Sequence, residues 1–184
     1  MRKLITIIMV SVLLVGFAGM AEAEFRGYKW GTDRDTIIEN EGEPLESSED
    51  MIYYEDELMG IDVFIGYQFI DDQLYKGIYL DFESHTYKVD YLGDLMTWIK
   101  GLKDKYGEVD GGGGIVWYDD LYKDGSDAGL AKGISYGDAI IRFYWDEGDT
   151  TITAKANGGN GRVNVGIVYR DPTVEEPEPS TEGL

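Results

Sequence analysis

Residues 61–70 read Ile61-Asp62-Val63-Phe64-Ile65-Gly66-Tyr67-Gln68-Phe69-Ile70, and Asp71-Asp72 separates them from Gln73-Leu74-Tyr75-Lys76-Gly77-Ile78-Tyr79-Leu80-Asp81-Phe82. Apolar residues occupy every second position of the first run, which is the period of a β-strand with one buried face. The acidic pair between the runs is typical of a tight turn. We therefore predict a β-hairpin in which Ile78, Leu80 and Phe82 continue the buried side of the first strand.

This hairpin belongs to a layout that occurs twice in the chain. The first copy, about residues 30–82, starts with a short helix that Thr32 caps and Gly42 ends. The second copy, about residues 90–170, starts with a longer amphipathic helix that ends at Gly107. Strands are predicted at about residues 51–55, 61–70, 74–82, 115–122, 139–145, 150–156 and 162–170. Long strands with only two helices predict an α+β fold, in which two tandem α-then-β units form an antiparallel sheet with helices packed on one face.

The two ends of the chain differ from its middle. Arg2 and Lys3 precede an apolar run, and Ala21-Glu22-Ala23 has the small-x-small pattern of a signal peptidase site. We therefore predict a signal peptide at residues 1–23 and a single α+β domain at residues 24–172, exported to the periplasm or the cell exterior. Residues 173–184 mix prolines with glutamates, so we expect them to form a disordered acidic tail.

The chain is strongly acidic. It contains 36 Asp and Glu residues against 16 Lys and Arg residues, for a net charge of −20. Such a surface repels phosphate backbones and anionic lipid, so we expect no nucleic-acid partner and no stable membrane insertion after signal cleavage. The same charge favours solubility outside the cell, and an alternative is that it forms a negative patch for a basic partner or for cations.

One face of the predicted sheet carries the candidate binding residues. If Val63 and Ile65 point into the core, Phe64 points outward, and the assumed burial of Ile78 and Leu80 turns Tyr79 outward as well. The polar Arg142 favours an outward set that also includes Tyr144. Because aromatic residues and arginine dominate interface hot spots, this face is predicted to bind a protein or a glycan. The alternative is that these side chains form cross-strand pairs that only stabilise the sheet. The predicted binding residues are Phe64, Tyr79, Arg142 and Tyr144.

Catalytic and metal-binding motifs do not fit their context. Gly133-Ile134-Ser135-Tyr136-Gly137 matches the G-x-S-x-G pattern of hydrolases, but a strand is predicted where that motif requires a helix. The single histidine, His85, is expected in an exposed linker, and one histidine does not supply the usual zinc ligand set. The acidic stretch Asp119–Asp127 lacks the spacing of a helix-loop-helix calcium site, so it would hold calcium only weakly. We therefore expect no catalytic residue, no cofactor and no metal. The alternative function is an extracellular hydrolase that uses two carboxylates.

The N-terminal half of the chain resembles known exported proteins. Phe25-Arg26-Gly27-Tyr28-Lys29-Trp30-Gly31-Thr32, Glu41-Gly42-Glu43-Pro44 and Tyr53-Tyr54-Glu55 resemble the opening of a group of uncharacterised exported bacterial proteins, and the residues from Gly66 to Tyr75 are similar to the strand-turn-strand unit of that group. The layout also resembles the outer-membrane assembly lipoprotein BamE and the repeats of the β-lactamase inhibitory protein. The resemblance implies two tandem α+β units and a binding role rather than catalysis. The chain departs from BamE in having no cysteine for a lipid anchor.

Overall fold

The computed structural model describes residues 25–111 and 113–176. The predicted signal peptide lies outside the described residues, as do residues 177–184 of the predicted tail. The fold is α+β, as predicted: within the described part, three helices contact one antiparallel sheet of eight strands. The elements in chain order are α1 (Arg34–Glu41), β1 (Glu46–Ser47), β2 (Met51–Leu58), β3 (Ile61–Ile70), β4 (Gln73–Asp81), α2 (Asp90–Tyr106), β5 (Gly114–Trp117), α3 (Asp127–Tyr136), β6 (Ala139–Asp146), β7 (Thr151–Gly159) and β8 (Arg162–Arg170).

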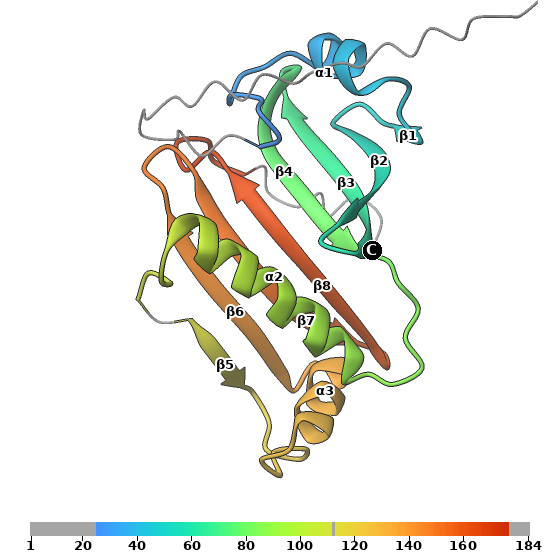
Figure 1. Cartoon of the computed structure of the whole chain (residues 1–184), viewed down its shortest axis with the longest axis vertical. Coiled ribbons are helices and arrows are strands. Elements are labelled where there is room, and N and C mark those ends of the chain that lie inside the picture. The colour runs from blue at the N-terminus through green and yellow to red at the C-terminus, as the bar shows by residue number, and fades with distance from the viewer. Residues whose placement is uncertain (1–24, 112, 177–184) are drawn as a thin grey trace, which may run out of the picture.

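The sheet joins two halves of the chain side by side (Figure 1). Its strand order is β1-β2-β3-β4-β8-β7-β6-β5, so each half contributes four neighbouring strands. The halves meet where β4 pairs with β8, in a register that runs from Lys76 opposite Arg170 to Leu80 opposite Gly166. The two tandem units of the sequence are therefore parts of one sheet and share its core.

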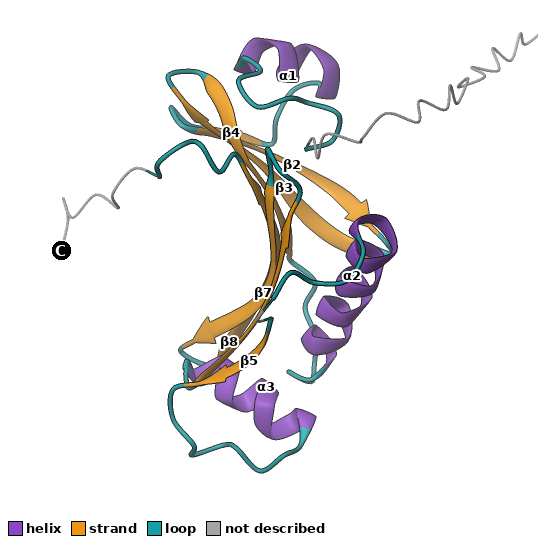
Figure 2. Ribbon diagram, turned by 90° about the vertical axis from the view of Figure 1, so that its left-hand side faces the viewer, coloured by secondary structure: helices purple, strands orange, loops and turns teal. Residues whose placement is uncertain are grey.

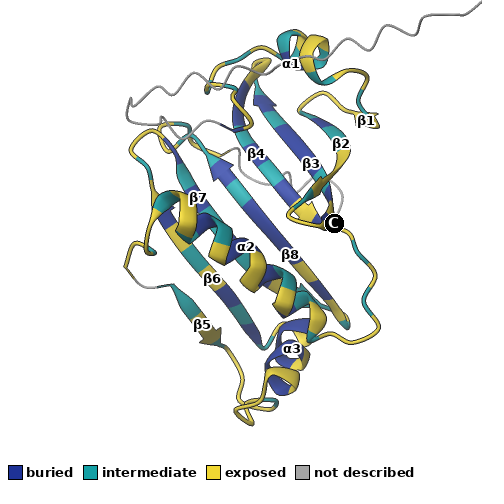
Figure 3. Ribbon diagram, in the orientation of Figure 1, coloured by how far each residue is buried: buried dark blue, intermediate teal, exposed yellow. Residues whose placement is uncertain are grey.

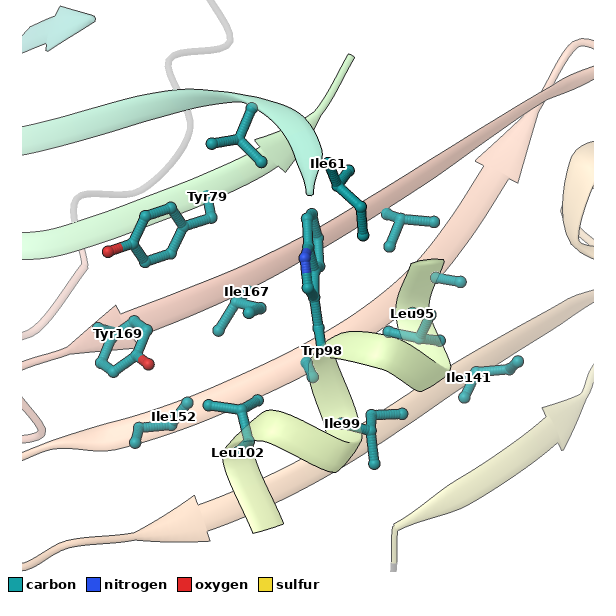
Figure 4. Close-up of a cluster of buried hydrophobic side chains, with 14 of the residues drawn as sticks. Ile61, Tyr79, Leu95, Trp98, Ile99, Leu102, Ile141, Ile152, Ile167 and Tyr169 are labelled. Carbon is teal, nitrogen blue, oxygen red and sulfur yellow. The ribbon is translucent and has the colours of Figure 1, made fainter. Parts of the chain in front are cut away.

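Helices cover one face of this sheet and leave the other open (Figure 2). α2 packs across β7 and β8, and α3 lies against β6, β7 and β8 on the same side. None of the helices in the described residues is long and apolar enough to cross a membrane. The side chains that α2 buries against the sheet recur at three- and four-residue spacing, as an amphipathic helix requires (Figure 4). They are Leu92, Leu95, Trp98, Ile99 and Leu102.

Burial along the central strands follows the strand period (Figure 3). Val63 and Ile65 are buried on the helix side of β3, and Phe64 between them points to the other face, which confirms the predicted alternation of this strand. The two-residue turn after β3 is also confirmed, because Asp71 and Asp72 adopt φ angles of 49° and 62°.

Two local predictions are wrong. The N-cap of α1 is Asp33 rather than Thr32, and its Oδ1 accepts a hydrogen bond from the Thr36 amide at 2.8 Å. The predicted strand at residues 115–122 ends at Trp117, and a helix not expected from the sequence, α3, follows it. Glycines in this segment weaken its intrinsic helix preference, but one of them has a packing role. A Cβ on Gly133 would lie 2.7 Å from the Trp117 ring, so the glycine lets α3 approach β5 closely.

The close contact between Gly77 and Phe25 gives a test of the core. A Cβ on Gly77 would lie 2.1 Å from the buried Phe25 ring, so Gly77→Ala forces the ring to move within a packed core. We expect this change to lower the free energy of unfolding by about 1–3 kcal/mol, measured by urea denaturation.

Gly93→Ala is the matched control. Gly93 is an exposed residue of α2 with nothing within 4 Å of an added Cβ, so alanine is expected to leave stability unchanged or raise it by up to about 1 kcal/mol. Equal stability of the two variants would show that the Phe25 ring does not pack closely against Gly77 of β4.

Candidate functional site

The open face of the sheet carries a groove of about 730 Å³ that crosses β4, β8, β7 and β6. Its residues alternate along each strand with core residues such as Tyr79 and Ile167, so the groove lies on the face opposite α2 and α3. The lining consists of Lys76, Ile78, Leu80, Arg142, Tyr144, Thr151, Thr153, Lys155, Asn157, Asn164, Val165, Gly166, Val168, Arg170 and Glu176.

Strand register arranges these side chains in rows. Lys76 lies beside Arg170 across the β4–β8 pair. Arg142 lies beside Lys155 across the β6–β7 pair. Between these two basic pairs runs a row of uncharged side chains, formed by Ile78, Val168, Thr153 and Tyr144. The groove therefore has two positive ends and an uncharged middle.

The positive charge of this groove stands out in a chain whose net charge is −20. Lys155 is half-buried, and it makes no ion pair with a described residue. Burial, followed by the neighbouring charges of Lys76 and Arg142, lowers the pKa of Lys155, and the Glu176 carboxylate offsets only part of this effect. Arg142 donates a hydrogen bond to the Tyr144 hydroxyl at 2.7 Å and also has no carboxylate partner among the described residues. Both side chains are thus available to an anion.

The opposite end of the groove already holds a carboxylate. After β8, the Asp171 amide bonds to the Tyr75 carbonyl, and the chain then brings Glu176 over the sheet. The Lys76 Nζ lies 2.9 Å from Glu176 Oε1, and Arg170 Nη1 lies 3.8 Å from the same atom. The hydrogen bond from Lys76 is the main cause that lowers the pKa of Glu176. Glu176, which the sequence assigns to the disordered tail, therefore contacts two side chains of the sheet.

The structure brings together two of the four predicted binding residues. Arg142 and Tyr144 both line the groove on β6. Phe64 also faces outward, but it lies on β3, one strand beyond the groove, where its ring stacks on Phe82 with 4.3 Å between centroids. That stacking matches the alternative interpretation of Phe64, a pair that stabilises the sheet.

The predicted outward orientation of Tyr79 is wrong. Tyr79 is 9% exposed and lies on the helix-covered face, with its ring 5.1 Å from that of Phe25, whereas Leu80 is 39% exposed. The register of the hairpin shifts by one residue beyond Gln68, so β4 does not continue the alternation of β3 through the turn. β4 thus turns its aromatic residue inward and Ile78 and Leu80 outward.

Sequence reasoning missed three of the basic residues, Lys76, Lys155 and Arg170. Each lies at an even spacing from uncharged residues on the same side of its strand, as Lys155 does from Thr151 and Thr153, which is a usable signal for a shared face. No local pattern shows that β4 and β8 are neighbours, and only that pairing brings these charges together.

The residues considered for catalysis and metal binding have other contacts. Ser135 is fully buried inside α3, and its hydroxyl donates to the Lys132 carbonyl, so the G-x-S-x-G match does not form a nucleophile turn. In the stretch Asp119–Asp127, Asp124 accepts hydrogen bonds from the amide and hydroxyl of Ser126, which is the N-cap of α3. Glu176 is the one carboxylate among the described lining residues, so these do not supply the pair that a hydrolase needs.

The predicted exposure of His85 is also wrong. Its side chain is 17% exposed, its ring packs edge-on against Tyr91, and its Nε2 lies 2.5 Å from Asp94 Oδ2.

Comparison with known proteins adds no relative to this picture. No protein-family model, curated protein or solved structure matches the chain. The resemblance to exported bacterial proteins therefore stays a prediction.

Proposed function

We propose that this chain is an exported binding protein that holds an acidic peptide segment in the groove on the open face of its sheet. The observation that carries the proposal is the presence of Arg142 and Lys155 in that groove, neither of which forms an ion pair with a described carboxylate. The signal-peptide pattern of residues 1–23 supports export.

The distribution of charge explains why an anion would bind in this groove. Four of the chain's 16 basic residues line one groove, while the surface as a whole is negative. An acidic ligand is repelled elsewhere and attracted here, so electrostatics would direct it to the groove and reject other orientations. The half-buried Lys155 gains most, because a carboxylate beside it offsets both its desolvation and its like-charged neighbours.

The spacing of the basic pairs specifies the ligand further. Positions four residues apart on a strand are separated by about 13 Å, which is the spacing between the row of Lys76 and the row of Lys155. An extended peptide with acidic side chains about four residues apart matches this distance. The uncharged row between the pairs, including Ile78 and Val168, would contact its apolar residues.

Glu176 supports the choice of a peptide over a glycan. Its carboxylate, which belongs to a chain segment lying over the sheet, already bridges Lys76 and Arg170. A ligand peptide would make the same type of contact at Arg142 and Lys155, and would compete with Glu176 at the other end.

Charge reversal in the groove tests this function. The probe is a fluorescein-labelled peptide with two glutamates four positions apart and valines between them, and binding is measured by fluorescence anisotropy at low salt. We expect Lys155→Glu and Arg142→Glu each to weaken binding by about 10-fold or more, because each places a like charge against the ligand. Raising the salt concentration should weaken wild-type binding as well.

Lys100→Glu is the matched control. It changes the net charge equally, but Lys100 lies on the exposed side of α2, away from the groove. We expect its affinity to stay within about 2-fold of wild type, since charges far from the site are screened. An equal loss in Lys100→Glu, or tighter binding of the same peptide with lysines in place of glutamates, would show that the groove does not select an acidic peptide.

The contact of Glu176 with the groove predicts a gain of affinity. Glu176→Gln removes the carboxylate that competes for Lys76 and Arg170, so the acidic probe should bind about 2- to 5-fold more tightly, the range expected for an exposed ion pair. Glu175→Gln is the control, because it makes the same change one residue earlier and should have a smaller effect. If both variants gain the same affinity, the gain comes from weaker general repulsion between the acidic chain and the acidic probe, and not from the loss of competition at Lys76.

A further inference from the structure

We propose that Asp81, His85 and Asp94 bind one divalent transition-metal ion, Zn²⁺ or Mn²⁺, on the helix-covered face of the sheet. This site is separate from the groove and lies on the opposite face of the sheet.

Three elements bring the ligand atoms together. Asp81 ends β4, His85 lies in the linker that follows, and Asp94 lies in the first turns of α2. One potential ligand atom from each residue falls within 4.8 Å of the other two, and this is the one such grouping of three or more residues in the described part of the chain. A third carboxylate is close, since Glu83 Oε2 lies 3.9 Å from His85 Nε2.

Asp81 gives an independent sign that a cation belongs here. The residue is 8% exposed, and its Oδ1 accepts a hydrogen bond from the Glu83 amide at 2.8 Å. Its Oδ2 is buried and has no hydrogen-bond partner among the described residues. A buried carboxylate oxygen without a partner is costly, and a metal ion at the cluster would satisfy it.

The charges of the cluster do not balance without a cation. Asp81, Glu83 and Asp94 surround a single imidazole, so even a protonated His85 leaves an excess of negative charge. A divalent ion would compensate these charges.

The donor set indicates the class of metal. Calcium and magnesium prefer sites built from oxygen alone, whereas zinc and manganese accept imidazole nitrogen together with carboxylate oxygen. Three protein ligands leave positions for water, and the buried Asp81 limits how large the coordination shell can become.

A metal at this place would connect the two halves of the chain. It would tie the end of β4 to the start of α2 across the linker formed by residues 82–89. His85 Nε2 and Asp94 Oδ2 are already 2.5 Å apart, so binding requires a small separation of these atoms rather than a rearrangement of the backbone. The ion would therefore act mainly by stabilising the docking of α2.

The single histidine of the chain makes a direct test possible. The purified full chain is first treated with a chelator and then titrated with Zn²⁺ while the imidazole signals are followed by NMR. We expect the signals of His85 to be replaced by a bound set that is complete at one equivalent. The melting temperature should rise by roughly 5–10 °C at a metal concentration about 100 times Kd. Mg²⁺ and Ca²⁺ should produce neither effect at the same concentration. Unchanged imidazole signals at one equivalent of Zn²⁺ would overturn the proposal.

Variants separate the site from general attraction of cations to an acidic protein. Loss of an outer-shell partner costs a metal site about 10–100-fold in affinity, so Asp94→Asn, which removes a ligand, should cost at least as much by titration calorimetry. Asp120→Asn removes an equal charge from an exposed loop and is expected to leave the affinity unchanged. Circular dichroism of the chelated proteins checks that each variant is folded. Equal affinities for the two variants would also overturn the proposal.

Discussion

The pairing of β4 with β8 is the constraint on which both faces of the sheet depend. Each half of the chain forms its own run of antiparallel strands, and five residue pairs from Lys76–Arg170 to Leu80–Gly166 join them. A Cβ on Gly166 would lie 2.9 Å from the backbone oxygen of Tyr79, so a glycine at this position allows the two strands to come together. On the open face the pairing assembles the basic groove, and on the covered face it makes one core from two small ones.

The covered face explains why the two halves stay together. Phe25, near the start of the described chain, packs its ring against Tyr67 and Tyr79 of the first half and Tyr169 of the second. The hydroxyl of a buried tyrosine needs a hydrogen-bond partner, and Tyr67 donates a hydrogen bond to Glu41 Oε1 at 2.9 Å. Burial raises the pKa of Tyr67 and of Tyr169, so both rings stay neutral in the core. This aromatic cluster spans the seam and supplies apolar contact on both sides of it.

The sequence predicts the individual helices and strands of this fold better than it predicts how they pair and pack. Alternation was sufficient for β3, and three- and four-residue spacing was sufficient for α2, because each pattern is local. Alternation gave the wrong orientation for Tyr79, because aromatic and aliphatic residues alternate in β4 and either set could form the core. The contact of Gly77 with Phe25 decides between them, and that contact joins distant parts of the chain.

α3 was missed for a related reason, because Gly133 weakens the local helix signal while it allows close packing on Trp117. The outward orientation of Arg142 and Tyr144 could be predicted from one strand alone. Lys76, Lys155 and Arg170 required the strand order.

Both proposed sites depend on one strand and one register. β4 presents Lys76, Ile78 and Leu80 to the groove, and Tyr79 and Asp81 to the covered face. Because strand side chains alternate, a slip of one residue would exchange these two sets. The groove would then receive a carboxylate and an aromatic ring, while the core would have to bury Lys76 without a counter-charge. Burying an unpaired ammonium costs several kcal/mol, on the order of the stability of a whole domain. The basic groove and the carboxylate cluster are therefore not independent features of the sheet, because the same energetic penalty keeps the lysine on one face and Asp81 on the other.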